Sequence, residues 1–237
     1  MLNMLKRIIP QYLVLFGCFS VLCAFSAQAR GAGVPLQQVE KIQQFYRNLT
    51  SLSFDFKQIT DSNGRTREGA GNSIFYRPSS TSAGIMRWDY TSPGKQIILN
   101  DGKELSVYTA KDKQLLIMSA QKLQSDITYS FFVGKRDLKQ DFNLLPVDSR
   151  YAASAKAQTD IAVQLIPKQP HGQIKSLHFW FDKDSKIKRL IMEDHFETTT
   201  ELLFSNIQFN ALPADSSQTV AQLVRLNIPS DTEIIRQ

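Results

Sequence analysis

The sequence predicts an α+β protein in which a meander of antiparallel β-strands follows one amino-terminal helix and is interrupted by a helical insertion. Short apolar runs recur along most of the chain, and turn-forming residues separate them at regular intervals, which is typical of such a meander. Apolar residues recur instead at three- and four-residue intervals in residues 35–51 and again in residues 119–145, which indicates helices.

Length and composition are those of a folded domain. The chain has 237 residues, of which 42% are hydrophobic and 21% are charged, so it is neither disordered nor fibrous and can bury one sizeable core. One domain is therefore expected.

The first 29 residues have the pattern of a secretory signal. Lys6 and Arg7 precede an apolar run in residues 8–25, and the small-residue sequence 27–29 (Ala-Gln-Ala) follows it. We expect cleavage after Ala29, which leaves residues 30–237 as a single domain.

Two alternative readings of the amino terminus match the sequence less well. A transmembrane anchor needs about 20 nearly unbroken apolar residues, and polar or helix-breaking residues interrupt this run at Pro10, Gln11, Gly17 and Ser20. Lipid attachment at a cysteine is the other alternative, but Leu22 before Cys23 and Phe16 near Cys18 match its processing pattern poorly.

The mature chain predicted in this way contains no cysteine, since Cys18 and Cys23 both lie in the signal, so disulfide and thiolate chemistry are excluded. Removal of Lys6 and Arg7 lowers the net charge from +6 to +4. So small and dispersed an excess predicts mild attraction to anionic surfaces and argues against a nucleic-acid partner.

The expected elements follow in chain order. Residues 35–51 form an amphipathic helix, whose apolar positions are Leu36, Val39, Ile42, Phe45, Tyr46 and Leu49. Turns at 61–64, 78–82, 92–94 and 100–102 separate strands that include residues 54–59, 71–76, 85–90 and 96–99. Later strands are expected at 174–181, 186–195 and 199–209, after a turn at 167–172; residues 211–218 are expected to be a loop, and 222–228 an edge strand ended by Pro229.

The helical insertion is expected within residues 119–145, as one or two short helices between strands. Turn residues become rare there, and the apolar residues at helical intervals are Leu123, Ile127, Phe131, Phe132, Leu138 and Phe142.

The residues of enzymes and metal sites are scarce. The three histidines fit no zinc-protease spacing, and no nucleophile elbow or phosphate-binding glycine loop occurs. His195 follows Glu193 and Asp194, but consecutive strand residues point to opposite faces, so a solvated strand end is expected. The residues from Asp182 onward resemble a calcium-binding loop only in part, because Lys186 stands at a ligand position and Ile187 stands where the sharp turn of such a loop requires glycine. A hairpin turn is expected instead. We predict binding without catalysis, cofactor or metal.

Residues 54–108 resemble the outer-membrane lipoprotein carrier family, the LolA proteins. The residues that carry the resemblance are Phe56 with Gln58, Gly64, Glu68-Gly69-Ala70-Gly71, Arg77 with Pro78, Trp88, Pro93, Asn100-Asp101-Gly102-Lys103 and Tyr108. It continues more weakly through residues 129–134, 179–207 and 226–229. The chain departs from the pattern at 80–84 and 211–222, where connections are longer, which puts a partner-docking surface in doubt.

The resemblance implies an incomplete antiparallel β-barrel, a strongly curved sheet whose helical lid encloses a hydrophobic cavity. It implies a periplasmic monomer whose cargo is acylated lipoproteins, with an inner-membrane lipoprotein-releasing ABC transporter as donor and an outer-membrane lipoprotein acceptor as recipient. The expected cavity and lid residues are Phe56, Phe75, Arg77, Met86, Trp88, Tyr90, Ile98, Leu123, Phe131 and Phe132.

Strand alternation supports part of this set directly. Met86, Trp88 and Tyr90 share one strand face, and the charge of Arg87 on the other marks theirs as the interior one. Arg77 matches the family's arginine before a proline, which bonds to the lid and steadies the closed, empty state. An exposed arginine at a strand end is the alternative for Arg77.

Three other functions remain open to the sequence. A carrier of the same fold could bind another lipid, such as a glycolipid, because the residues named above do not distinguish acyl chains on a protein from acyl chains on a small molecule. A lipid-sensing regulatory domain is the second, although such regulators usually carry a further domain. A hydrolase is the third, and the missing nucleophile and base disfavour it.

Overall fold

The computed structural model describes residues 36–78, 84–123, 132, 137–152, 161–170, 172 and 174–237. The chain divides into two units, residues 1–30 and 31–237, and every described residue belongs to the second. The predicted signal and its cleavage site therefore lie outside the described residues and stay predictions.

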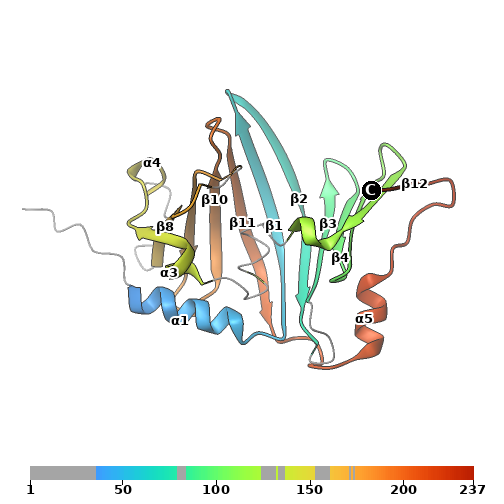
Figure 1. Ribbon diagram of the computed structural model, residues 1–237, viewed down its shortest axis with the longest axis horizontal. Helices are drawn as coiled ribbons and strands as arrows, with labels where there is room; N and C mark the ends of the chain where they lie inside the picture. Colours follow the sequence, from blue (N-terminus) through green and yellow to red (C-terminus); the bar gives the residue numbers. More distant parts are fainter. Residues whose placement is uncertain are drawn as a thin grey trace, which may run out of the picture. The chain divides into compact units, whose positions relative to one another are not determined.

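Helices and strands fill most of the described part (Figure 1). The helices are α1 (Leu36–Arg47), the 3₁₀ turn η1 (Ala120–Leu123), α3 (Leu138–Asp141), α4 (Ser149–Ala152) and α5 (Ser217–Val224). The strands are β1 (Ser51–Ser62), β2 (Arg65–Tyr76), β3 (Ile85–Ser92), β4 (Gln96–Asn100), β5 (Glu104–Thr109), β6 (Gln114–Ser119), β7 (Phe142–Leu145), β8 (Ile161–Pro167), β9 (Ser176–Phe181), β10 (Ile187–Glu193), β11 (Thr199–Phe209) and β12 (Glu233–Arg236).

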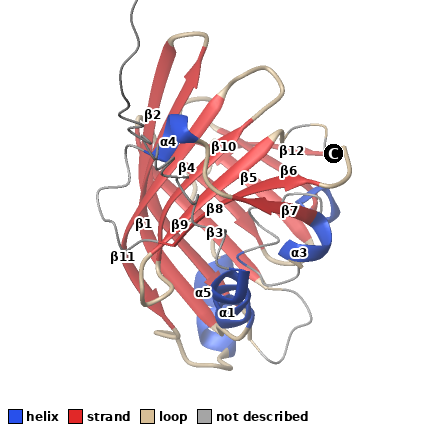
Figure 2. Ribbon diagram, turned by 90° about the vertical axis from the view of Figure 1, so that its left-hand side faces the viewer, coloured by secondary structure: helices blue, strands red, loops and turns tan. Residues whose placement is uncertain are grey.

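All described strands belong to one 12-stranded sheet, in the order β12-β6-β5-β4-β3-β2-β1-β11-β10-β9-β8-β7. Pairing is antiparallel throughout, except that β12 runs parallel to β6. The end strands β12 and β7 do not pair with each other, so the sheet bends without closing (Figure 2). The predicted α+β fold with an incomplete antiparallel barrel is confirmed.

Each face of the sheet is buried by a different helix. Helix α1 packs on one face, here called the α1 face, through Val39, Ile42 and Tyr46, which join a cluster that includes Phe54 and Trp88. Helix α5 packs on the opposite face, the α5 face, over β3 to β6. The residues of the α5-face cluster are Tyr76, Ile85, Ile97, Leu99, Tyr108, Leu115 and Ile117, against Leu212, Val220, Leu223, Val224, Leu226 and Ile228.

The carboxy-terminal part of the sequence prediction was wrong. Residues 222–224 belong to α5, which the Ser216 hydroxyl caps by accepting a hydrogen bond from the Thr219 N–H at 3.1 Å. The added edge strand is β12, at Glu233–Arg236, instead of residues 222–228. Residues 142–145 form strand β7, whereas the helical insertion was expected to extend to residue 145.

Tight backbone geometry fixes the centre of the sheet. The β1–β2 turn places Asn63 and Gly64 at φ values of 53° and 74°, the left-handed region that this hairpin turn requires. At Gly71 the register between β2 and β3 shifts, and β3 approaches so closely that an added Cβ would overlap the Asp89 carbonyl oxygen. Only glycine fits at that position.

Candidate functional site

The α1 face carries a wall of aromatic side chains drawn from separate strands. Phe54 on β1 lies 6.1 Å from Phe75 on β2, 5.6 Å from Trp88 on β3 and 4.8 Å from Phe204 on β11, between ring centroids. Strand alternation puts these residues on one face, and each is at most 8% exposed.

Phe132, from the predicted helical insertion, lies against this wall. Its ring centroid is 4.9 Å from Phe75, 5.6 Å from Phe54 and 6.1 Å from Phe204, and the side chain is 2% exposed. One aromatic residue of the insertion is thus packed at the centre of the α1 face. Of its predicted companions, Phe131 and the side chain of Leu123 lie outside the described residues.

The alternation predicted for residues 85–90 is confirmed. Met86 and Trp88 are buried in the α1-face cluster and Tyr90 packs against it. Phe56 lies 4.7 Å from Trp88 and 4.9 Å from Tyr90 between ring centroids. Ile98 pairs opposite Trp88 and packs against the same cluster. The predicted wall residues therefore lie together, while their role in binding stays a prediction.

Arg87 lies on the α5 face, as predicted, and it has partners there. Its guanidinium pairs with Asp89 at 2.6 Å and donates to the carbonyl oxygens of Leu223 and Arg225 at the end of α5. A charge at the carboxyl end of a helix complements the helix dipole, so Arg87 fastens α5 to the sheet.

Arg77 joins the end of β2 to helix α1. Its Nη2 donates to the carbonyl oxygen of Tyr46 at 2.7 Å, and its backbone N–H donates to the Thr50 carbonyl at 2.7 Å. Burial lowers the pKa of the Arg77 guanidinium. The described contacts thus connect Arg77 to α1; the predicted contact with the lid stays a prediction.

Tyr46 is a residue that sequence reasoning counted only as apolar. Its hydroxyl accepts a 2.9 Å hydrogen bond from the backbone N–H of Ile187, and its ring centroid lies 6.3 Å from that of Phe132. Burial raises the pKa of the Tyr46 phenol. Together with the bond from Arg77, these contacts make Tyr46 a bridge between β2 and β10.

Helix α1 also contacts α3, in the carboxy-terminal half of the insertion. The Gln43 side-chain oxygen accepts a 2.8 Å hydrogen bond from the Leu138 N–H at the start of α3, and Glu40 pairs with Lys139. Arg47 lies 3.8 Å from Asp137. These polar positions of α1 resembled an ordinary solvated helix face in the sequence.

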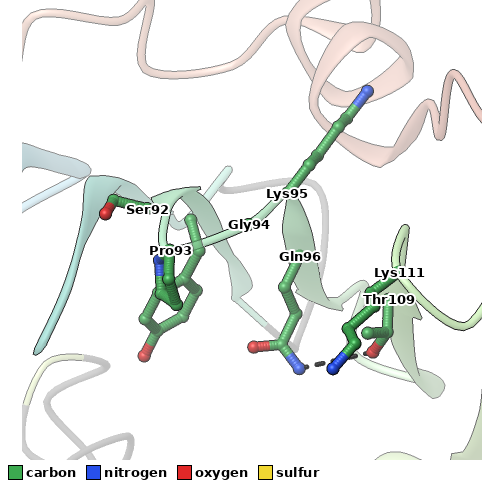
Figure 3. A pocket seen from close by; sticks show the side chains of 8 residues that line it. Ser92, Pro93, Gly94, Lys95, Gln96, Thr109 and Lys111 are labelled. Atoms are coloured by element: carbon green, nitrogen blue, oxygen red, sulfur yellow. Dashed lines mark hydrogen bonds between the residues drawn. The ribbon is translucent and has the colours of Figure 1, made fainter. Parts of the chain in front are cut away.

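A pocket of about 490 Å³ opens where β3 and β5 end and β4 begins (Figure 3). Phe75 pairs with Met86, near the other end of β3. Tyr90, Gln96, Thr109 and Lys111 line it, with the 92–95 turn. Figure 3 shows Gln96, Thr109 and Lys111 on one side of the hairpin and Lys95 extending away from them.

A buried polar cluster on the other side of β9 and β10 was not foreseen. Glu193 is 2% exposed, and its carboxylate accepts from Lys175 at 2.6 Å and from Arg150 of α4 at 3.1 Å. Burial works to raise the pKa of Glu193, but the hydrogen bond from Lys175 and the charge of Arg150 outweigh it and lower that pKa. The solvated strand end predicted here was wrong for Glu193, although His195 is exposed.

His178 lies beside this carboxylate. It is 0% exposed, its Nε2 is 3.2 Å from the Ser176 hydroxyl, and its Nδ1 has no hydrogen-bond partner. Burial lowers its pKa to about 4, so the ring is neutral near neutral pH. Within the described residues no group of acidic, histidine or cysteine side chains is arranged to hold a metal ion. The Asp182 carboxylate accepts from the backbone N–H groups of Asp184 and Lys186, as the predicted hairpin turn requires.

The family model and the curated relatives both indicate one family. The family described as outer membrane lipoprotein carrier protein LolA matches residues 47–219. Outer-membrane lipoprotein carrier proteins from Nitrosomonas europaea and Methylobacillus flagellatus are 25% and 28% identical, over 75% and 76% of this chain and 81% and 82% of theirs. The chain belongs to the LolA family.

A solved structure supports the fold. An uncharacterized conserved protein from Thermus thermophilus superposes with a TM-score of 0.51 at 14% identity, over 85% of this chain and 99% of that chain. None of the helices in the described ranges has the length and apolar content required to cross a membrane.

Proposed function

We propose that this chain is a periplasmic carrier that binds the acyl chains of lipoproteins released from the inner membrane by an ABC transporter and delivers them to an outer-membrane acceptor. The family match and the names of the relatives support the cargo. The observation that carries the proposal is the place of Phe132, an apolar side chain of the insertion packed on the aromatic wall of an unclosed sheet.

Such an arrangement suits reversible lipid binding. Burial of an acyl chain is worth roughly 0.8 kcal/mol per CH₂ group, so one long chain supplies on the order of 10 kcal/mol. A carrier that bound with all of that free energy would release its cargo too slowly. Because Phe132 packs on the wall, an incoming acyl chain must replace the contacts of Phe132, and the net affinity falls.

The proposal is tested by a two-step assay on the purified mature protein. Inner-membrane vesicles that contain the transporter and ATP should release a labelled lipoprotein into solution only when the carrier is added. The complex should then transfer the label to outer membranes. Phe196→Ser, which alters an exposed turn residue, should behave as wild type. A carrier that leaves the lipoprotein in the vesicles would refute the proposal.

A further inference from the structure

The α1 face changes character along its strands. On β1, buried Phe54 and Phe56 are followed on the same face by half-buried Gln58 and Thr60. On β11, Phe204 and Leu202 give way in the same direction to Thr200, which pairs opposite Thr60. The face is therefore aromatic near α1 and polar toward the β1–β2 turn.

The polar residues are connected across the sheet. The Tyr90 hydroxyl donates to Gln58 Oε1 at 2.8 Å, Gln58 Nε2 donates to Thr60 Oγ1 at 3.2 Å, and the Thr60 and Thr200 hydroxyls are 3.3 Å apart. On the other side, Tyr90, Gln96 and Thr109 are direct cross-strand neighbours, and Gln96 Nε2 is 3.5 Å from Thr109 Oγ1. We call these residues the polar band: Gln58, Thr60, Tyr90, Gln96, Thr109 and Thr200.

Glycines on β2 keep the band continuous. Gly69 and Gly71 lie on the α1 face between Gln58 and Tyr90, and a Cβ at Gly69 would come within 3.4 Å of the Tyr90 ring. Because β2 has no side chain there, the Tyr90 ring crosses it to reach Gln58. Lys111 and the pocket of about 490 Å³ lie at the β5 end of the band.

An amphiphilic molecule bound to the α1 face has one favourable orientation along the strands. Its apolar part gains most by covering the aromatic wall, and its hydrogen-bond acceptors gain most beside amide, hydroxyl and ammonium donors. Ester and peptide carbonyl groups only accept hydrogen bonds, and the pocket is within the size range of small-ligand sites.

We propose that the pocket end of the polar band, with Gln96, Thr109 and Lys111, binds the glyceryl ester carbonyl oxygens of the acylated cargo. The acyl chains then extend toward Phe54 and Phe132, and the peptide leaves past Lys111. This inference rests on the proposed function and adds to it the orientation of the cargo.

The test uses two synthetic lipopeptides with equal chain lengths, one with ester-linked and one with ether-linked chains on the same glyceryl cysteine. The ether form keeps the apolar surface and lacks the ester carbonyl acceptors. The variant with Lys111→Ala and Gln96→Leu should bind the ester form about tenfold less tightly than wild type, as expected for loss of hydrogen bonds from a charged donor. Its affinity for the ether form should change much less.

Lys103→Ala is the matched control, because Lys103 is exposed at the opposite end of β5. Binding is read from the fluorescence anisotropy of dye-labelled lipopeptides, and thermal unfolding checks that each variant folds. Equal losses for both lipopeptides, or no loss for either, would overturn the carbonyl site while leaving the carrier function intact. If wild type bound neither lipopeptide, the proposed function itself would fail, and the orientation with it.

Discussion

The guanidinium of Arg77 and the carbonyl oxygen of Tyr46 are 2.7 Å apart, and this hydrogen bond ties the end of β2 to the last turn of α1. Tyr46 in turn contacts Ile187 through its hydroxyl and Phe132 through its ring. Any movement of α1 away from the sheet must therefore break the bond from Arg77.

Arg77→Leu should favour the open, loaded state. The substitution removes a charge-assisted hydrogen bond, worth about 1.5–3 kcal/mol, and adds apolar surface beside the wall. We expect the variant to accept lipoprotein normally and to deliver it poorly, so loaded carrier accumulates. The two-step assay scores both stages, with Arg65→Leu at the exposed start of β2 as control. Normal delivery would rule out that the bond from Arg77 to Tyr46 opposes opening, and loss of both stages would indicate misfolding.

A photo-crosslinking residue at position 86 should capture the acyl chains of the cargo, because Met86 is 5% exposed within the α1-face cluster. The control is position 57, since Lys57 is exposed beside Phe56 on the opposite face of β1. Mass spectrometry of the adducts measures both yields. Comparable labelling at the two positions would mean that cargo does not occupy the α1 face.

Gly71→Ala should destabilise the fold by about 2–3 kcal/mol, as overpacking of a close backbone approach does. Its Cβ would overlap the Asp89 carbonyl oxygen and come within 2.9 Å of the Tyr90 Cα. Gly94→Ala is the matched control, because nothing lies within 4 Å of a Cβ there. Urea unfolding gives both free energies, and equal values would show that β3 can move away from β2 at little cost.

Stability should fall on acidification. The pKa of His178 is lowered to about 4 by burial, from an ordinary value of 6.5, so the unfolded chain binds a proton first as pH falls from about 6.5 to 4. The lowered pKa of Glu193 acts in the same direction below its ordinary value of 4.5, because protonation breaks its pairs with Lys175 and Arg150.

His178→Gln should remove the first part of this dependence. We expect the melting temperature of wild type to drop by roughly 5 °C more than that of the variant between pH 7 and pH 5. His195→Gln, at an exposed turn, is the control. Parallel curves for wild type and His178→Gln would show that His178 is protonated equally in both states.

The sequence predicted those elements whose apolar residues fit a single periodicity, either that of a strand or that of a helix. Residues 222–228 failed because two periods fit them: Val224, Leu226 and Ile228 alternate as in a strand, whereas Val220, Leu223 and Val224 have the helical spacing that α5 uses to cover β3 to β6. The helix is favoured because it covers the apolar α5 face, and that face exists only once the sheet has assembled.

The site was predictable where alternation applies and unpredictable where distant segments meet. Met86 and Trp88 could be placed from β3 alone. The partner of Arg77 lies 31 residues away on α1, and the charges that neutralise buried Glu193 lie 18 and 43 residues away. No local sequence pattern indicates that residues so far apart in the chain come into contact.

The position of β1 has a consequence for how the protein folds. On one side β1 forms a hairpin with β2, its neighbour in sequence; on the other it pairs with β11, where Thr60 meets Thr200 across 140 residues. Strands β1 to β6 and β7 to β11 can each assemble through local hairpins, but the join between them must wait for closure of that long loop, which slows folding. Until it closes, β1 and β11 are both open edges, and this seam is where an incompletely folded chain would pair with a second copy.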